Sequence, residues 1–222
     1  MRAAEPSRSR ARTAALRAGL AVDGVGIQDG FLGAAGIRQL MACAEVRRAR
    51  GGFADARIGA ARQTQRHAEI RGDQTCWLAE PLLEQERALC RDLDGLRLDL
   101  NREGLLGLWE LEMHYAWYPP GAGYARHIDQ FQGRDERVVS LILYLNAAWS
   151  PEAGGELRLF DAVSGDRDIE PLGGRLVCFL AAAREHAVLP TRQGRLSLTG
   201  WFRHRGHPSQ VQAARAGIIH EQ

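Results

Sequence analysis

The hydrophobic pattern changes its period once along the chain, near Gly107, and this change constrains the fold more than any other feature. Before Gly107, apolar residues recur at helical steps within Phe31–Arg50 and from Leu82 to Leu100, which predicts two amphipathic helices, the second ending near Gly104. After it, short segments alternate apolar and polar residues between Gly, Pro, Asp and Asn turns. The expected strands are Leu108–Tyr118, Val138–Asn146, Glu156–Phe160, Arg175–Leu180 and Arg195–Arg203. Short strands that follow helices predict a mainly β sandwich or barrel supported by N-terminal α-helices, rather than alternating βαβ units.

The length and composition suit one folded domain with a tail at each end. With 222 residues, 45% of them hydrophobic and 25% charged, the chain can bury a core without disulfides. We assign residues 1–18, rich in Arg, Ala and Ser, to a basic tail, residues 19–205 to the domain and residues 206–222 to a C-terminal tail. Between the two helices, Gly51–Glu69 has little periodicity and is expected to form a long functional or disordered loop.

Composition also excludes several classes of protein. No apolar run approaches the length of a membrane span. The net charge of +2 is too small for a dedicated nucleic-acid binder. The four cysteines form no CxxC pair, and residues 1–17 lack the apolar core of a secretory signal. We therefore expect a cytoplasmic protein that has no membrane or nucleic-acid partner and whose cysteines are reduced and structurally packed.

Three residues in the strand-rich half carry metal-ligand chemistry: His127, Asp129 and His186. Residues i and i+2 of a strand point to the same face, so His127 and Asp129 can offer an imidazole and a carboxylate side by side. Two His and one carboxylate leave further coordination positions open, which suits non-haem Fe(II). A closed zinc site would need a fourth ligand, usually Cys, and none has suitable spacing. Because a His-x-Asp motif arises readily by chance, the residues around it decide whether these three form a site.

A polar strand face headed by Arg195 is the second feature. Strand alternation places Leu196, Leu198 and Phe202 on one face, and Arg195, Ser197, Thr199 and Trp201 on the other. Burying such a face requires an anion, and the planar guanidinium of Arg suits a carboxylate. Tyr144, on the same strand face as Ser140, could donate its hydroxyl to this anion. Tyr118 ends its strand just before a Pro- and Gly-rich turn, which fixes where the segment of His127 begins.

These residues lie in an ordered set of five segments: Tyr118–Asp129, Ser140–Asn146, Gly154–Leu159, His186–Pro190 and Arg195–Phe202. The set resembles the motifs of the 2-oxoglutarate and Fe(II)-dependent dioxygenases of the prolyl hydroxylase type. Upstream, Ile70–Trp77 is similar to the segment after the mobile substrate loop in the hypoxia-factor prolyl hydroxylases and their bacterial relatives. The resemblance extends from Phe31 to Arg203.

This resemblance implies a double-stranded β-helix, or jelly roll, in which the two histidines and the aspartate hold Fe(II). It implies that 2-oxoglutarate chelates the iron through its keto acid end, while Arg195 and Tyr144 bind its distal carboxylate. Tyr118 and Thr199 would line the co-substrate pocket. O2 is the second co-substrate, succinate and CO2 are released, and ascorbate is the implied reductant.

The resemblance further implies that Tyr124, Arg137 and Trp201 face the substrate. Arg71 and Asp73 are two residues apart in an expected strand, so both side chains would face the same side and could form an ion pair that sets the angle of the preceding loop. The alternative is a solvated pair on the surface. The implied substrate is a prolyl residue in an exposed loop of a protein, with the bacterial elongation factor Tu as the candidate. Hydroxylases of small metabolites would not need to share the segment that contains Arg71 and Asp73.

Other functions stay open on the sequence alone. A hydroxylase of a free amino acid or a small metabolite would use the same cofactors, because fold does not specify the substrate. A non-catalytic jelly-roll binding module is less favoured, because the metal residues and Arg195 are all intact. Nucleic-acid dealkylases of this fold carry a second Arg further along the strand, at the position of Trp201 in this chain.

Overall fold

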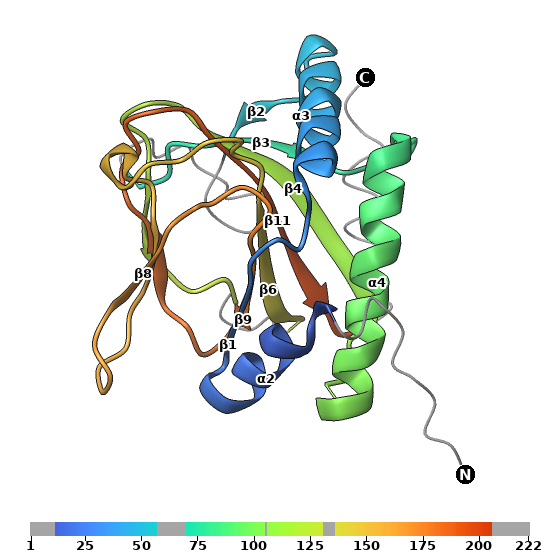
Figure 1. Ribbon diagram of the computed structural model, residues 1–222, viewed down its shortest axis with the longest axis vertical. Helices are drawn as coiled ribbons and strands as arrows, with labels where there is room; N and C mark the ends of the chain where they lie inside the picture. The colour runs from blue at the N-terminus through green and yellow to red at the C-terminus, as the bar shows by residue number, and fades with distance from the viewer. Residues whose placement is uncertain (1–11, 57–69, 105, 131–135, 206–222) are drawn as a thin grey trace.

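The computed structural model describes residues 12–56, 70–104, 106–130 and 136–205, and within these ranges two antiparallel sheets form the body of the protein (Figure 1). The larger sheet contains, in spatial order, β1 (Val25–Gln28), β9 (Leu176–Leu180), β6 (Arg137–Tyr144), β11 (Arg195–Arg203), β4 (Glu110–Tyr118), β3 (Gln74–Trp77) and β2 (Ala54–Asp55). The smaller sheet contains β5 (Tyr124–His127), β10 (His186–Val188), β7 (Leu157–Leu159) and β8 (Arg167–Ile169).

Two helices cover the face of the larger sheet that points away from β8, on the right in Figure 1. They are α3 (Ala34–Ala49) and α4 (Glu84–Gly104), so both helices predicted from the periodicity are confirmed. Their apolar stripes meet the outward-facing residues of the sheet in the largest core cluster. This core includes Leu40, Leu89, Leu93, Leu96, Tyr115, Leu198 and Phe202, each no more than 4% exposed.

Strand β11 has the bounds that its alternation predicted, and its two faces separate as expected. Leu196, Leu198 and Phe202 belong to the core under the helices. Arg195, Thr199 and Trp201 instead line a cavity on the inner side of the sheet. The strand therefore supplies packing on one face and leaves polar groups free for a site on the other.

The N-terminal region differs from the expected tail. Helix α2 (Ala14–Asp23) begins before residue 18 and buries Leu16 and Leu20. The chain backbones approach closely there, because a Cβ on Gly26 of β1 would lie 2.0 Å from the carbonyl oxygen of Leu16. The helix has only 10 residues, too few for its period to stand out beside the Arg-rich composition. Residues 1–11 and 206–222 lie outside the described residues, so the rest of the domain assignment stays a prediction.

Several short strands were not predicted. Strands β1, β5, β8 and β10 have three or four residues each, which is too short to establish a period of two. The expected loop at 51–69 includes β2, while residues 57–69 lie outside the described part of the chain. All four cysteines are free thiols. Among the described residues, no helix combines the length and hydropathy needed to cross a bilayer.

Candidate active site

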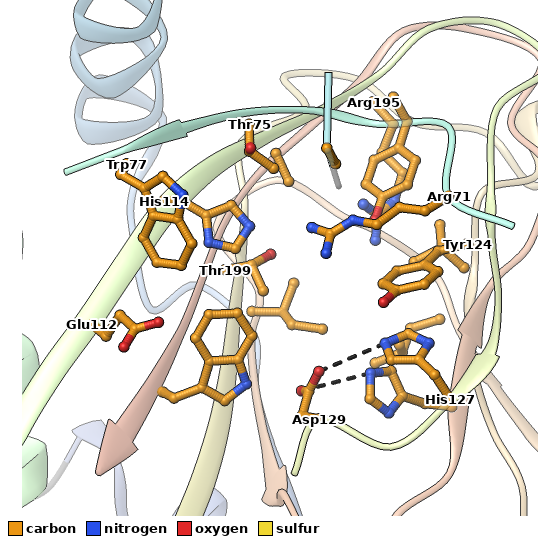
Figure 2. Close-up of a pocket in the computed structure, with 18 of the residues that line it drawn as sticks. Arg71, Thr75, Trp77, Glu112, His114, Tyr124, His127, Asp129, Arg195 and Thr199 are labelled. Carbon is orange, nitrogen blue, oxygen red and sulfur yellow. Dashed lines mark ion pairs between the residues drawn. The ribbon is translucent and has the colours of Figure 1, made fainter. Parts of the chain in front are cut away.

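A cavity of about 610 Å³ is lined by residues from the inner faces of both sheets (Figure 2). Its wall on the larger sheet is built from cross-strand pairs between β4 and β11. From one end to the other, the opposing residues that line it are Tyr118 and Arg195, His114 and Thr199, and Glu112 and Trp201. The smaller sheet contributes His127 and His186 opposite this wall.

His127, Asp129 and His186 come together as predicted. One ligand atom from each lies within 4.8 Å of the others. Nε2 of His127 is 3.6 Å from Oδ1 of Asp129, and Nε2 of His186 is 3.7 Å from Oδ2 of the same carboxylate. The prediction that His127 and Asp129 share one face of a strand is wrong. Strand β5 ends at His127, so Asp129 lies in the bend after the strand.

Backbone and hydroxyl groups hold these three side chains in an arrangement that suits a metal ion. Nδ1 of His127 donates to the carbonyl oxygen of Ala125 at 2.7 Å, and Nδ1 of His186 to that of Arg184 at 3.0 Å. Each imidazole therefore directs the lone pair of Nε2 toward the carboxylate, the usual arrangement of a metal-binding histidine. Ser140 on β6 donates its hydroxyl to Oδ2 of Asp129 at 2.7 Å.

The protonation of the cluster also suits a metal ion. Burial by itself would raise the pKa of Asp129, but the neighbouring His186 and His127 and the hydrogen bond from Ser140 outweigh it and hold that pKa well below its ordinary value. Burial lowers the pKa of His186, which keeps its imidazole neutral. Metal ions bind carboxylates and neutral imidazoles, so Asp129 and His186 are in the forms that bind metal.

Arg195 lies at the other end of the cavity wall, 1% exposed and without a carboxylate partner among the described residues. Its Nε donates to the carbonyl oxygen of Gly155 at 2.9 Å, whereas its Nη2 has no hydrogen-bond partner in the described part of the chain. The guanidinium carbon lies 4.9 Å from the ring centre of Tyr118 and 5.0 Å from that of Tyr144. The hydroxyl of Tyr144 is likewise buried and makes no hydrogen bond with any residue that the structure describes. Two unsatisfied donors around a buried positive charge fit the carboxylate of a bound co-substrate.

The residues expected around the co-substrate and substrate also reach this cavity. Burial raises the pKa of Tyr118, so its phenol stays a neutral donor, and Thr199 lines the same wall. The ring of Tyr124 stacks on His127 with centroids 3.6 Å apart. The Arg137 guanidinium carbon lies 3.5 Å from the ring centre of Trp201, and its Nη2 bonds to Glu112 at 2.9 Å.

Arg71 and Asp73 form the expected ion pair, with Nε to Oδ1 at 2.8 Å and Nη2 to Oδ2 at 3.1 Å. The alternative of a solvated surface pair is wrong, because the Asp73 side chain is fully buried. The expected strand is also wrong at this point: β3 begins at Gln74, and Arg71 makes only an isolated bridge to Tyr124. Through this bridge and the Arg71 guanidinium, 4.7 Å from the Tyr124 ring centre, the pair reaches the cavity.

Sequence analysis missed three residues of the wall: Trp77, Glu112 and His114. The signal that could have found two of them is the alternation of β4, since Glu112 and His114 share a face with the predicted Tyr118. Trp77 is brought in by the pairing of β3 with β4, which places it opposite His114.

Comparison with known proteins identifies the family. The 2OG-Fe(II) oxygenase superfamily matches residues 113–203, a range that includes the three metal-ligand candidates and Arg195. Egl nine homolog 1 from Homo sapiens is 32% identical over 189 residues, which are 81% of this chain and 43% of the human protein. The chain thus spans less than half the length of that relative. A prolyl-4-hydroxylase from Pseudomonas putida is 42% identical over 87% of this chain and 99% of that one, with a TM-score of 0.78. This chain belongs to the 2-oxoglutarate and Fe(II)-dependent oxygenases of the prolyl hydroxylase type.

A second solved structure supports the same fold for this oxygenase. It is a prolyl hydroxylase from Trichoplax adhaerens in complex with a hypoxia inducible factor oxygen degradation domain peptide fragment. It is 26% identical, with a TM-score of 0.79, over 97% of this chain and 95% of that chain. The predicted jelly roll and the predicted family are both confirmed. The family implies Fe(II), 2-oxoglutarate and O2, and the His127–Asp129–His186 cluster and the unsatisfied Arg195 both fit these groups.

Proposed function

We propose that this oxygenase hydroxylates a prolyl residue in an exposed loop of a protein, using Fe(II), 2-oxoglutarate and O2 and releasing succinate and CO2. One observation carries the proposal. The same cavity holds three metal-ligand atoms within 4.8 Å of one another and a buried guanidinium that no carboxylate of the described residues neutralises. A metal site alone would not need the second feature.

In this proposal His127 and His186 would each hold the iron through Nε2, and Asp129 would hold it through a carboxylate oxygen. When bound, Fe(II) and 2-oxoglutarate supply the O2-dependent oxidation of a C–H bond. The chain itself contributes orientation. The carbonyl oxygens of Ala125 and Arg184 keep both imidazoles in one tautomer, and Ser140 fixes the rotamer of the carboxylate.

Arg195 and Tyr144 bind the distal carboxylate of 2-oxoglutarate, and Tyr118 and Thr199 line its pocket. The burial of Arg195, Tyr144 and Tyr118 excludes water, which strengthens the ion pair and fixes the co-substrate in one position. Tyr124, Arg137 and Trp201 face the substrate, while the buried Arg71–Asp73 pair anchors the segment that leads into β3.

A protein substrate is favoured by two relatives. The Pseudomonas putida relative is a prolyl-4-hydroxylase, and the Trichoplax adhaerens relative is bound to a peptide fragment. Bacterial elongation factor Tu is the candidate that we propose to test first, with ascorbate as the reductant in the assay.

The test is incubation of the purified chain with Fe(II), 2-oxoglutarate, ascorbate and elongation factor Tu, followed by mass spectrometry of the tryptic peptides. We expect one added oxygen atom on a single prolyl residue, and none with the His127→Ala or Asp129→Ala variant. Vigorous hydroxylation of free L-proline instead would favour a small-molecule hydroxylase. If 2-oxoglutarate is not converted to succinate at all, the chain is a binding module.

A further inference from the structure

The part of the cavity wall beyond the co-substrate residues is aromatic. Trp77 lies opposite His114 in the β3–β4 ladder, and His114 lies opposite Thr199 in the β4–β11 ladder. The His114 ring centre is 4.7 Å from that of Trp77 and 5.5 Å from that of Trp201. Figure 2 places Trp77, His114 and Thr199 on one side of the cavity, across from Tyr124 and His127.

His114 is the unusual member of this wall. It is 1% exposed, and its Nδ1 has no hydrogen-bond partner among the described residues. Burial, helped by the positive charges of Arg71 and Arg137, lowers the pKa of His114 to about 3, so the ring is neutral near pH 7. A neutral imidazole offers one donor and one acceptor. A phenylalanine would fill the same space without burying an unsatisfied nitrogen, so packing alone does not account for this residue.

A second polar atom in the wall is also without a partner. Nε1 of Trp201, a residue 5% exposed, makes no hydrogen bond within the described part of the chain. The indole offers a donor only, whereas the imidazole can accept or donate. A peptide group carries one carbonyl acceptor and one N–H donor, so it can satisfy both atoms together. The flanking indoles suit the apolar atoms on either side of such a group.

The position of the wall fits the space that the co-substrate leaves. Arg195 and Thr199 are four residues apart on β11, which corresponds to about 13 Å of strand. A co-substrate anchored at Arg195 would reach the metal cluster beside Trp201, because Ser140, which bonds to Asp129, pairs with Trp201. The part of the cavity lined by His114 and Trp77 is then left for a second ligand next to the metal cluster. Trp77 is 48% exposed and Trp201 is buried, so the wall extends from the solvent to the interior.

We propose that His114 is a specificity-determining residue, which hydrogen-bonds a backbone peptide group next to the target prolyl residue while Trp77 and Trp201 pack on either side of that group. The inference rests on the proposed function, because it requires a peptide substrate. It explains how the cavity distinguishes a prolyl residue within a chain from free proline, which has no flanking peptide groups.

The test compares variants that differ only in hydrogen bonding. His114→Phe keeps a ring and removes both nitrogens, whereas His114→Asn restores a donor and an acceptor. His204→Phe is the matched control, because its ring is exposed outside the cavity wall. The probes are elongation factor Tu and a library of heptapeptides with a central proline, assayed by mass spectrometry and succinate release. We expect the KM for the best peptide to rise about tenfold in His114→Phe, the loss typical of one hydrogen bond to a buried group.

The expected pattern also includes recovery of most of this loss in His114→Asn and no change in His204→Phe. The KM for 2-oxoglutarate should change far less than the KM for the peptide, since a merely structural role would raise both. If His114→Phe does not fold, His114→Leu and His114→Asn provide the same comparison. An unchanged peptide KM, or a loss that His114→Asn does not recover, overturns the inference alone. If the wild type hydroxylates free L-proline and no peptide or protein, both the inference and the proposed function are overturned.

Discussion

His127 on β5 and His186 on β10 lie directly opposite each other in the ladder of the smaller sheet, with ring centroids 4.1 Å apart. The register of this pair brings together two residues that are distant in the sequence, and Asp129 reaches both from the bend after β5. A slip of one residue in either strand would turn one imidazole to the opposite face of the sheet. The candidate metal site therefore depends on strand pairing as much as on the identity of its three residues.

Loss of the Ser140 hydroxyl should weaken metal binding without removing a ligand. In Ser140→Ala the Asp129 carboxylate loses its 2.7 Å hydrogen bond and with it one constraint on its rotamer. We expect the affinity for Mn(II), measured by titration of the metal-free protein, to fall about 10- to 100-fold. Ser164→Ala, at an exposed turn, is the control. Equal affinity in both variants would show that Ser140 does not position the carboxylate.

Arg195→Ala should weaken the binding of 2-oxoglutarate by about 2–5 kcal/mol, because the distal carboxylate would lose its buried charge partner. Calorimetric titration of the Mn(II)-loaded protein without O2 measures this directly, while metal binding itself should largely persist. Arg192→Ala is the matched control, since Arg192 is exposed and bonds to the carbonyl oxygen of Glu152. An unchanged dissociation constant in Arg195→Ala would assign another role to this residue.

Removing only the Asp73 carboxylate from the Arg71–Asp73 pair should destabilise the fold. Asp73→Leu leaves a largely buried guanidinium without its partner, which costs about 3–5 kcal/mol for a buried pair. The double variant Arg71→Met/Asp73→Leu should recover much of that loss, because apolar replacement of both members removes the unpaired charge. Urea unfolding of the two variants and of wild type measures the difference. A double variant as unstable as the single one would contradict this account.

Glu86 should make stability depend on pH. Burial would raise the pKa of its carboxyl, but the paired Arg47 guanidinium and hydrogen bonds from Leu83 and Tyr115 outweigh it and lower that pKa. Because the folded pKa lies below the unfolded value of about 4.3, the stabilisation is fully present above that pH and is lost as the pH falls through the folded pKa.

Glu86→Gln should therefore cost about 1–3 kcal/mol at neutral pH and show a shallower loss of stability on acidification than wild type. Urea midpoints between pH 7 and pH 3 test this. Glu84→Gln, at an exposed position in the first turn of α4, is the control. Parallel pH profiles for wild type and Glu86→Gln would contradict the prediction.

The Arg195 side of the site could be predicted because its residues lie on a strand long enough to show its alternation. β11 has nine residues, and its polar face led directly to Arg195, Thr199 and Trp201. His114 lies on an equally long strand, β4, but its apolar neighbours give no local sign that its Nδ1 has no hydrogen-bond partner among the described residues. Only the pairing of β4 with β3 and β11 brings Trp77 and Thr199 to its sides.

By itself, the sequence determined the helical stripes, the faces of the long strands and the candidate metal and anion residues, because side-chain period and chemistry are local properties. The tertiary structure alone decided three things: that helix α2 packs on the sheet, that Asp129 completes the cluster from a bend, and that the Arg71–Asp73 pair is buried. Each depends on which distant backbone covers a residue. Burial and register are properties of the assembled sheets, and no local period encodes them.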